Sequence, residues 1–257
     1  MFKENKQFWW FFVGIIVLFF IVYSALRSGF TTGSMNFSGF PFSLLNPNSG
    51  LYKPSTSELD VAKTYEATIK TNFGEFIIDL YTKNAPNTVG NFIHLTNSGY
   101  YSGTTFYRLV PNVLIQGGSS TTKNSNLNDD IFGGPGYTIP DENNWDSLDY
   151  SPELKAELTK LGYKSSTKIA SKDLEKYSVA MANNGPDTAG GQFFIVIAEN
   201  SNPKLENMRG KYTVFGGIKS GQDVIVKIAN LEVDDSNKEL TRPKEDVIIE
   251  KVTIRTK

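Results

Sequence analysis

Eight short runs of apolar or alternating residues limit the fold of this chain more than any other feature of its sequence. Residues 63–71 and 74–81 alternate apolar with polar positions, and Phe76, Ile78 and Leu80 share one face of the second run. Such a period of two is typical of a strand buried on one side. The other runs cover residues 105–110, 112–116, 177–182, 192–198, 212–216 and 246–255. Together they predict a mainly β domain, built as a sandwich or as a closed barrel.

Three segments have the period and the end signals of helices. One runs from the turn at residues 84–86 to Gly99, and the second covers residues 222–229. The third, residues 151–162, has a serine and a proline at its start and a glycine at its end, which are the usual capping residues. It lies in a long stretch between two strands, at about residues 119–176, which we interpret as an insertion.

The N-terminal region predicts a membrane anchor. Residues 7–26 carry no charged side chain, and a helix of that length spans about 30 Å, the hydrocarbon thickness of a bilayer. Two lysines precede this stretch and only Arg27 follows it closely, so the positive-inside bias predicts a cytoplasmic N-terminus. A cleavable signal peptide is the alternative, although Tyr23 and Leu26 do not fit the small residues that such a cleavage site needs.

The rest of the chain divides into a linker and a folded domain. Residues 28–60 are rich in Ser, Gly, Asn and Pro and show no sustained period, which is typical of a linker. We therefore predict a cytoplasmic tip and transmembrane anchor over residues 1–27, a linker over 28–60 and one domain over 61–257. The localisation that follows is a single-pass membrane protein whose domain lies outside the cytoplasm.

Composition excludes several classes of function. The chain has no cysteine and one histidine, His94, which excludes thiol nucleophiles, Fe–S clusters and most histidine-rich metal sites. Its net charge of −1 gives no field that would attract nucleic acid. The spacing of Asn126, Asn128 and Asp130 resembles the start of a calcium loop, but the required glycine and final glutamate are missing. We expect no metal, no cofactor and no nucleic-acid partner.

Two segments carry the chemistry, FYRLVPNVLIQGG at residues 106–118 and MANNGPDTAGGQFFI at residues 181–195. Here the sequence resembles the cyclophilin family of peptidyl-prolyl cis–trans isomerases, with a match from about Tyr65 to Thr253. The match also includes residues 85–92, 99–106, 133–137 and 214–216. The resemblance implies a closed eight-stranded antiparallel barrel capped by two helices, and substrates that are proline-containing polypeptides.

A catalyst of rotation about an X–Pro bond needs mainly to stabilise the twisted state by electrostatic interactions. The barrier of about 18–20 kcal/mol comes from lost amide resonance, and no bond is cleaved. A donor helps if it meets the prolyl nitrogen once its lone pair localises in the twisted state. Arg108 suits this task because its planar guanidinium stays charged, and it occupies the family's catalytic arginine position. The alternative is a surface arginine that pairs with a carboxylate.

The remaining site residues follow from the resemblance. Gln116 is expected to orient the substrate carbonyl, unless it is a glutamine satisfied inside the barrel. Substrate contacts are implied for Phe106, Val113, Leu114, Ala182, Asn183, Gln192, Phe194, Leu205 and Tyr212. Among these, Ala182 and Asn183 match the segment whose backbone pairs with bound peptide, and the apolar side chains form a socket for the proline ring. Each apolar residue alone would be interpreted as ordinary core.

Departures from the family pattern concern the socket. Val113 replaces a customary large aromatic residue, and the tryptophan of many eukaryotic members is absent around Lys204, so we expect a looser socket. The chain is thus predicted to be a membrane-anchored peptidyl-prolyl isomerase that assists folding of exported or membrane-associated proteins. The alternative is a non-catalytic module that binds proline-containing peptides at the membrane.

Overall fold

The computed structural model describes residues 59–236 and 240–257, all within the unit Asn48–Lys257. The predicted anchor at residues 7–26 and nearly all of the predicted linker lie outside the described residues, so both stay predictions. Within the two described ranges, no helix combines the length and the apolar character needed to cross a bilayer.

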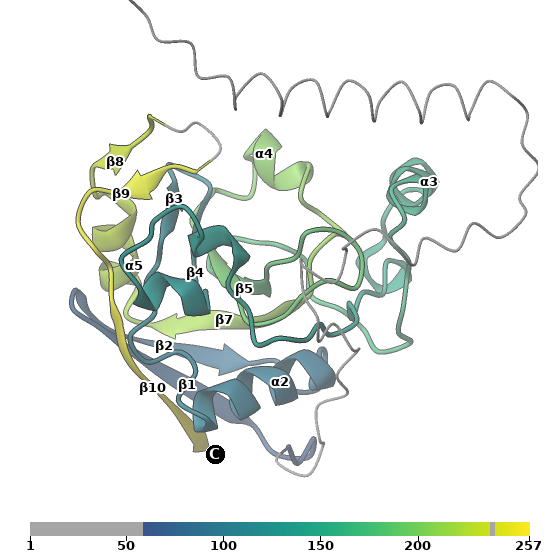
Figure 1. The fold of residues 1–257 in the computed structure, drawn as a ribbon. Helices are drawn as coiled ribbons and strands as arrows, with labels where there is room; N and C mark the ends of the chain where they lie inside the picture. The colour runs from purple at the N-terminus through teal and green to yellow at the C-terminus, as the bar shows by residue number, and fades with distance from the viewer. Residues whose placement is uncertain (1–58, 237–239) are drawn as a thin grey trace, which may run out of the picture. The chain divides into compact units, whose positions relative to one another are not determined.

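Eight antiparallel strands form one curled sheet, a half-barrel that carries few helices (Figure 1). The strands are β1 Tyr65–Thr71, β2 Gly74–Leu80, β3 Arg108–Val110, β4 Leu114–Gly117, β5 Ser178–Met181, β6 Phe193–Val196, β7 Val214–Ser220 and β10 Ile249–Thr256. Their order across the sheet is β10-β1-β2-β7-β5-β6-β4-β3. The predicted mainly β class is confirmed, and each of the eight predicted runs contains or overlaps one strand.

The two edges of the sheet meet over a short stretch just before β3. Thr105 and Ile248 form an isolated bridge, and the N–H of Phe106 donates to the carbonyl of Val247 at 2.9 Å. No ladder continues from this bridge, because β3 becomes regular only at Arg108. The structure therefore shows a curled half-barrel with one bridge between its edges, where a closed barrel is expected from the resemblance.

The main core lies inside the curl and is closed by two helices. Helix α2, Pro86–Asn97, and helix α5, Gln222–Ala229, pack against the sheet at separate places (Figure 1), as the sequence predicts. Aromatic rings meet edge to face at the centre, with Phe193 centroids 5.8 Å from Phe92 and 5.7 Å from Phe106. Such pairs add to the burial of their apolar surface.

A distant glutamate, rather than a local side chain, caps helix α2. Ala85 precedes the helix and offers no capping side chain. The carboxylate of Glu142 instead accepts from the backbone N–H groups of Asn87, at 3.0 Å, and Thr88, at 2.7 Å. A carboxylate at this end also complements the helix dipole. The insertion, which contains Glu142, is thereby tied to the half-barrel.

The insertion contains the third predicted helix and a small core of its own. Helix α3 spans Pro152–Lys160, and the Oγ of Ser151 accepts from the N–H of Leu154 as an N-cap. Trp145, Tyr150 and Leu158 are buried against one another. The other short elements, none of them predicted, are the 3-10 turns η3 Ser120–Lys123, η4 Asp130–Phe132 and η5 Asp146–Leu148, helix α4 Pro203–Glu206, and the hairpin β8 Val233–Asp234 with β9 Arg242–Pro243. In Figure 1, α3 and this hairpin lie on opposite sides.

Candidate active site

Three predicted site residues face one another across neighbouring strands. Arg108 on β3 is the register partner of Gln116 on β4, and Gln116 is the partner of Phe194 on β6. Residues directly opposite each other in a sheet project from the same face. The neighbour of Phe194, Phe193, belongs to the main core, so the site lies on the opposite face of the sheet.

A polar chain fixes the orientation of Arg108. Its Nη1 donates to Gln116 Oε1 at 3.0 Å. The amide nitrogen of Gln116 donates to Tyr107 Oη at 2.8 Å and to Gln192 Oε1 at 3.0 Å. The hydroxyl of Tyr107 also donates to Gln192 Oε1, at 2.6 Å. Because both N–H groups of the Gln116 amide are engaged, its oxygen must face the guanidinium.

This geometry makes Gln116 a positioning residue for Arg108. Contact of the Gln116 amide with the substrate carbonyl stays a prediction, since it requires one of the two internal bonds to open. A guanidinium has five N–H donors, and one hydrogen bond to Gln116 leaves others for a ligand. Within the described ranges no carboxylate pairs with Arg108, which is partly exposed.

Tyr107 is a site residue that the sequence reasoning misses. Strand alternation would place it on the opposite face from Arg108, but the regular strand begins only at Arg108, so Tyr107 is free to turn toward the site. Its position in the arginine motif is the only signal. Burial raises the pKa of Tyr107 above its usual range, partly offset by the charge of Arg108, so the hydroxyl remains a donor at physiological pH.

An apolar cluster lies beside the polar chain, where the resemblance places the socket for the proline ring. It contains four of the predicted contacts, namely Val113, Leu114, Phe194 and Leu205, and the partly buried Ala182, Met208 and Tyr212 pack against it. The ring of Tyr212 meets Phe194 edge to face, with centroids 5.1 Å apart. The structure therefore brings together these predicted residues from β4, β6, α4 and three connecting segments.

Two predicted contacts lie beneath the site. Leu205 is 0% exposed, and Phe106 is 1% exposed within the main core. Direct contact with substrate stays a prediction for both, and their burial indicates a supporting position. Met208, two residues after the end of helix α4 and partly exposed, packs against this cluster. The sequence reasoning misses it because the short helix that holds Leu205 carries no periodic signal.

The segment after β5 presents backbone groups to the site. The N–H of Ala182 donates to the carbonyl of Gln192 at 2.9 Å. The side chain of Asn183 donates to the carbonyl of Lys211 at 2.8 Å. The backbone N–H of Asn183 meets no acceptor among the described residues, and an unpaired N–H can pair with an extended peptide.

The insertion supports both segments that flank the socket. Trp145 Nε1 donates to the carbonyl of Gly210 at 3.1 Å, two residues before Tyr212. The hydroxyl of Tyr163 lies 3.4 Å from Asn183 Oδ1. Burial raises the pKa of Tyr163 to about 12, with further contributions from Tyr212 and Asp141. The insertion thus holds the two loops in place.

Two aspartates join the insertion to the loop after Asn183. The N–H of Asp141 donates to the carboxylate of Asp187 at 3.0 Å, and the N–H of Asp187 donates back to Asp141 at 2.9 Å. Burial raises the pKa of Asp141 to about 6, against the opposing effect of the hydrogen bond from Asp187. Partial burial would also raise the pKa of Asp187, but hydrogen bonds from Lys164 and from the backbone outweigh it and lower that pKa.

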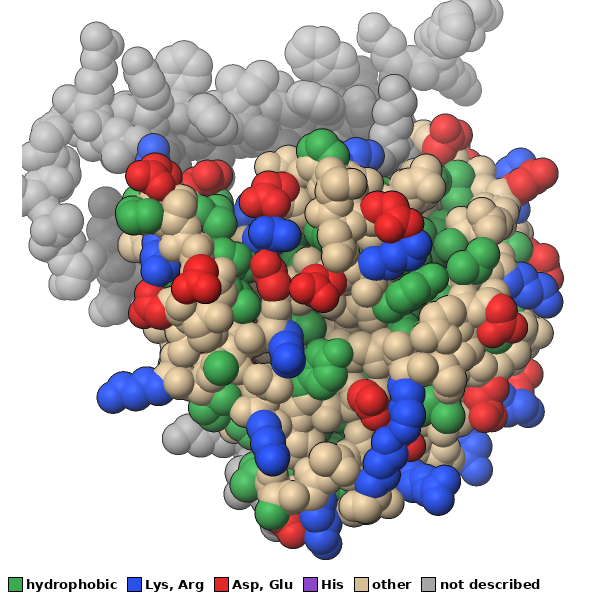
Figure 2. Space-filling view, turned by 180° about the vertical axis from the view of Figure 1, so that it is seen from behind, with side chains coloured by type: hydrophobic (Ala, Val, Ile, Leu, Met, Phe, Trp, Pro, Cys, Tyr) green, Lys and Arg blue, Asp and Glu red, His purple; other side chains and the backbone are tan. Residues whose placement is uncertain are grey.

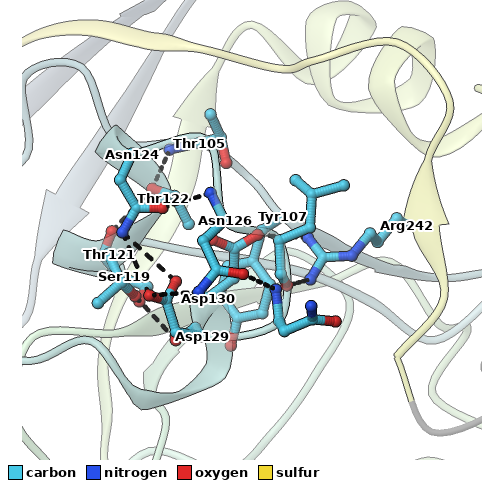
Figure 3. Close-up of polar contacts among 12 residues, drawn as sticks. Thr105, Tyr107, Ser119, Thr121, Thr122, Asn124, Asn126, Asp129, Asp130 and Arg242 are labelled. Carbon is cyan, nitrogen blue, oxygen red and sulfur yellow. Dashed lines mark hydrogen bonds and ion pairs between the residues drawn. The ribbon is translucent and has the colours of Figure 1, made fainter.

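The polar loop at the start of the insertion is organised by hydrogen bonds (Figure 3). Arg242 of β9 pairs with the buried carboxylate of Asp130 and donates to the carbonyl of Leu127. The amides of Asn124 and Asn126 donate to the carboxylate of Asp129. The structure described here holds no group of three or more His, Cys, Asp or Glu side chains suited to a metal ion. On the face seen in Figure 2, positive and negative side chains are interspersed.

Arg108 thus lies beside an apolar cluster on the outer face of a curled antiparallel sheet. Residues 66–254 match the family model described as cyclophilin type peptidyl-prolyl cis-trans isomerase/CLD. The chain belongs to this family.

Relatives and solved structures agree with that assignment. The chain is 31% identical to peptidyl-prolyl cis-trans isomerase B of Streptomyces anulatus, over 77% of this chain and 100% of the relative. It is 34% identical to peptidyl-prolyl cis-trans isomerase-like 1 of Gibberella zeae, over 74% of this chain and 95% of the relative. A crystal structure of a Cryptosporidium parvum cyclophilin type isomerase matches with a TM-score of 0.54 and 27% identity, covering 76% of this chain and 99% of the other.

Proposed function

We propose that this cyclophilin-type isomerase accelerates rotation about X–Pro bonds through Arg108, and that it acts on exported or membrane-associated proteins. The observation that carries the catalytic part is the fixed guanidinium of Arg108, bonded to Gln116 at 3.0 Å on the same sheet face as Phe194. A solved structure of the Cryptosporidium parvum isomerase was obtained in the presence of the dipeptide Ala-Pro. We propose the same class of ligand for the socket in this chain.

The mechanism rests on differential binding of the twisted amide. The apolar cluster around Phe194 holds the proline ring, and the backbone near Asn183 holds the adjoining peptide. As the peptide bond rotates, the prolyl nitrogen becomes pyramidal and its lone pair accepts a hydrogen bond from Arg108. That bond hardly exists in the planar ground state, so it lowers the barrier rather than strengthening substrate binding. No proton is transferred, and Arg108 stays charged throughout.

The membrane context is the second part of the proposal. It is supported by the uncharged stretch at residues 7–26 and by the lysines that precede it. A domain held outside the cytoplasm would meet chains that are still folding after export, and X–Pro isomerisation takes tens to hundreds of seconds when uncatalysed. Protease treatment of intact cells tests this topology, since digestion of residues 61–257 without lysis is expected and full protection would contradict it.

An isomerisation assay tests the catalytic part. The full chain in detergent is added to a tetrapeptide with one proline, and the cis-to-trans rate is followed while binding is measured by titration. Acceleration well above the uncatalysed rate is expected. Peptide binding without acceleration would select the alternative, a non-catalytic module anchored at the membrane.

A further inference from the structure

The polar loop beside the site exposes three large apolar side chains within six residues. Leu127 is 58% exposed, Ile131 39% and Phe132 74%. Single exposed apolar residues are common, whereas exposed apolar side chains that gather in one place mark interaction sites. We name these three residues the apolar loop.

The apolar loop is held in a defined position. Arg242 pairs with Asp130, whose side chain is 3% exposed, and also donates to the carbonyl of Leu127 (Figure 3). The pair is largely withdrawn from water, so solvent screens it little. Because Arg242 belongs to β9, these contacts join the loop to a second element. Its apolar side chains therefore stay in water in the folded state rather than collapsing onto the core.

A second attachment joins the loop to the active site. Gln192 Nε2 donates to the carbonyl of Ile131 at 3.0 Å and to that of Gly133 at 2.8 Å, which are the two carbonyls on either side of Phe132. The oxygen of the same amide accepts from Gln116, and Gln116 holds Arg108. Two side chains, Gln192 and Gln116, thus link the backbone on either side of Phe132 to Arg108, so the loop borders the proposed substrate site.

We propose that the apolar loop is a docking surface for the polypeptide substrate itself, where it binds an apolar side chain several residues away from the isomerised proline. This inference rests on the proposed isomerase function. The occupant follows from the hydrogen-bonded link between the loop and the site. An extended chain covers about 3.3 Å per residue, so a substrate whose proline lies beside Phe194 can reach with its flanking residues a loop that Gln192 holds. Unfolded chains expose the apolar residues that the folded state would bury, so the loop favours such substrates over short peptides.

Two peptides test the docking surface in the full chain. One is a tetrapeptide with a single proline, and the other is a twelve-residue peptide that holds the same four residues with leucines on both sides. Phe132→Ser removes the most exposed ring. Val226→Ser, on α5 and 46% exposed, is the matched control. The readout is the ratio of the KM for the long peptide to the KM for the tetrapeptide.

The proposal predicts that Phe132→Ser raises this ratio about 3- to 10-fold, because an apolar contact is lost only for the long peptide, while Val226→Ser leaves it unchanged. An unchanged ratio in Phe132→Ser would overturn the proposal. So would sedimentation showing that the substitution dissociates an oligomer, since the loop would then bind a second copy of the chain. Failure of the proposed function is distinguishable, because the unmodified chain would then not accelerate isomerisation of the tetrapeptide.

Discussion

Replacement of Gln192 by leucine tests whether the polar chain positions Arg108. The side-chain amide takes part in four hydrogen bonds, with Tyr107, Gln116, Ile131 and Gly133. The bond to Ile131 is exposed, so water can replace it. The other three are partly buried, and at about 1 kcal/mol each we expect the free energy of unfolding to fall by about 3 kcal/mol.

The same substitution also releases the amide of Gln116. Its nitrogen keeps only the bond to Tyr107, so the amide can rotate and the bond to Arg108 is made part of the time. Loss of about 1.4 kcal/mol of positioning would lower kcat/KM about tenfold. Urea unfolding and the tetrapeptide assay measure the two effects on the same sample.

Gln222→Leu is the matched control for this experiment. Gln222 bonds to the carbonyls of Ile218 and Lys219 at 3.5 and 3.4 Å, away from the site, so little change in either quantity is expected. If Gln192→Leu lost stability while kcat/KM stayed at the unmodified value, the polar chain would hold the loop but would not position the arginine, and the reasoning would be refuted.

Two further substitutions test the insertion. Burial raises the pKa of Asp141 to about 6 from an ordinary 3.8. The folded state therefore holds this proton more tightly than the unfolded state does, and the free energy of unfolding falls as the pH rises through about 4 to 6. Between pH 4.5 and 7 the loss is about 2 kcal/mol. Asp141→Asn should remove this pH dependence of stability, and Asp149→Asn, at an exposed position, should not. Chemical unfolding at the two pH values measures it, and an equal pH dependence in both variants would contradict the raised pKa. Gly210 has a φ of +73°, and a Cβ there would lie 2.5 Å from Leu158 Cδ1, whereas Gly99 has the same φ with open space around it. Gly99→Ala should lower the free energy of unfolding by about 1 kcal/mol because of its backbone conformation. Gly210→Ala should lower it by about 1–3 kcal/mol more because of the clash, and should also lower kcat/KM. Equal thermal stability of the two variants would show that the insertion does not pack on this loop.

Local patterns of apolar and polar residues in the sequence predict most of the strands of the sheet. Strands β1 and β2 are predicted almost to the residue because they are long, alternate regularly and bury one face. Helix α5 is predicted to its bounds for the same reason, with a period near 3.6. The meeting of the two sheet edges is not predictable in this way. It depends on one bridge, between Thr105 and Ile248, in an irregular segment that no periodicity specifies.

The site is predicted in part, through motifs rather than periodicity. Arg108, Gln116 and Phe194 come from the two conspicuous segments, and the register of β3, β4 and β6 explains why they meet. Tyr107 and Met208 are missed because each follows from an irregular backbone. The role of the insertion is also missed, since the contacts of Trp145 and Tyr163 join residues that are 65 and 20 positions apart in the chain.

The most direct test of the account is Arg108→Lys in the tetrapeptide assay, together with a measurement of peptide affinity. Lysine keeps a charge and can keep the bond to Gln116, but it lacks the planar fork that meets the prolyl nitrogen. We predict a fall in kcat of about 100- to 1,000-fold, as for loss of one donor that acts only in the transition state, with a peptide Kd that changes little. A variant that folds, binds the peptide and turns over at the unmodified rate would contradict the central claim.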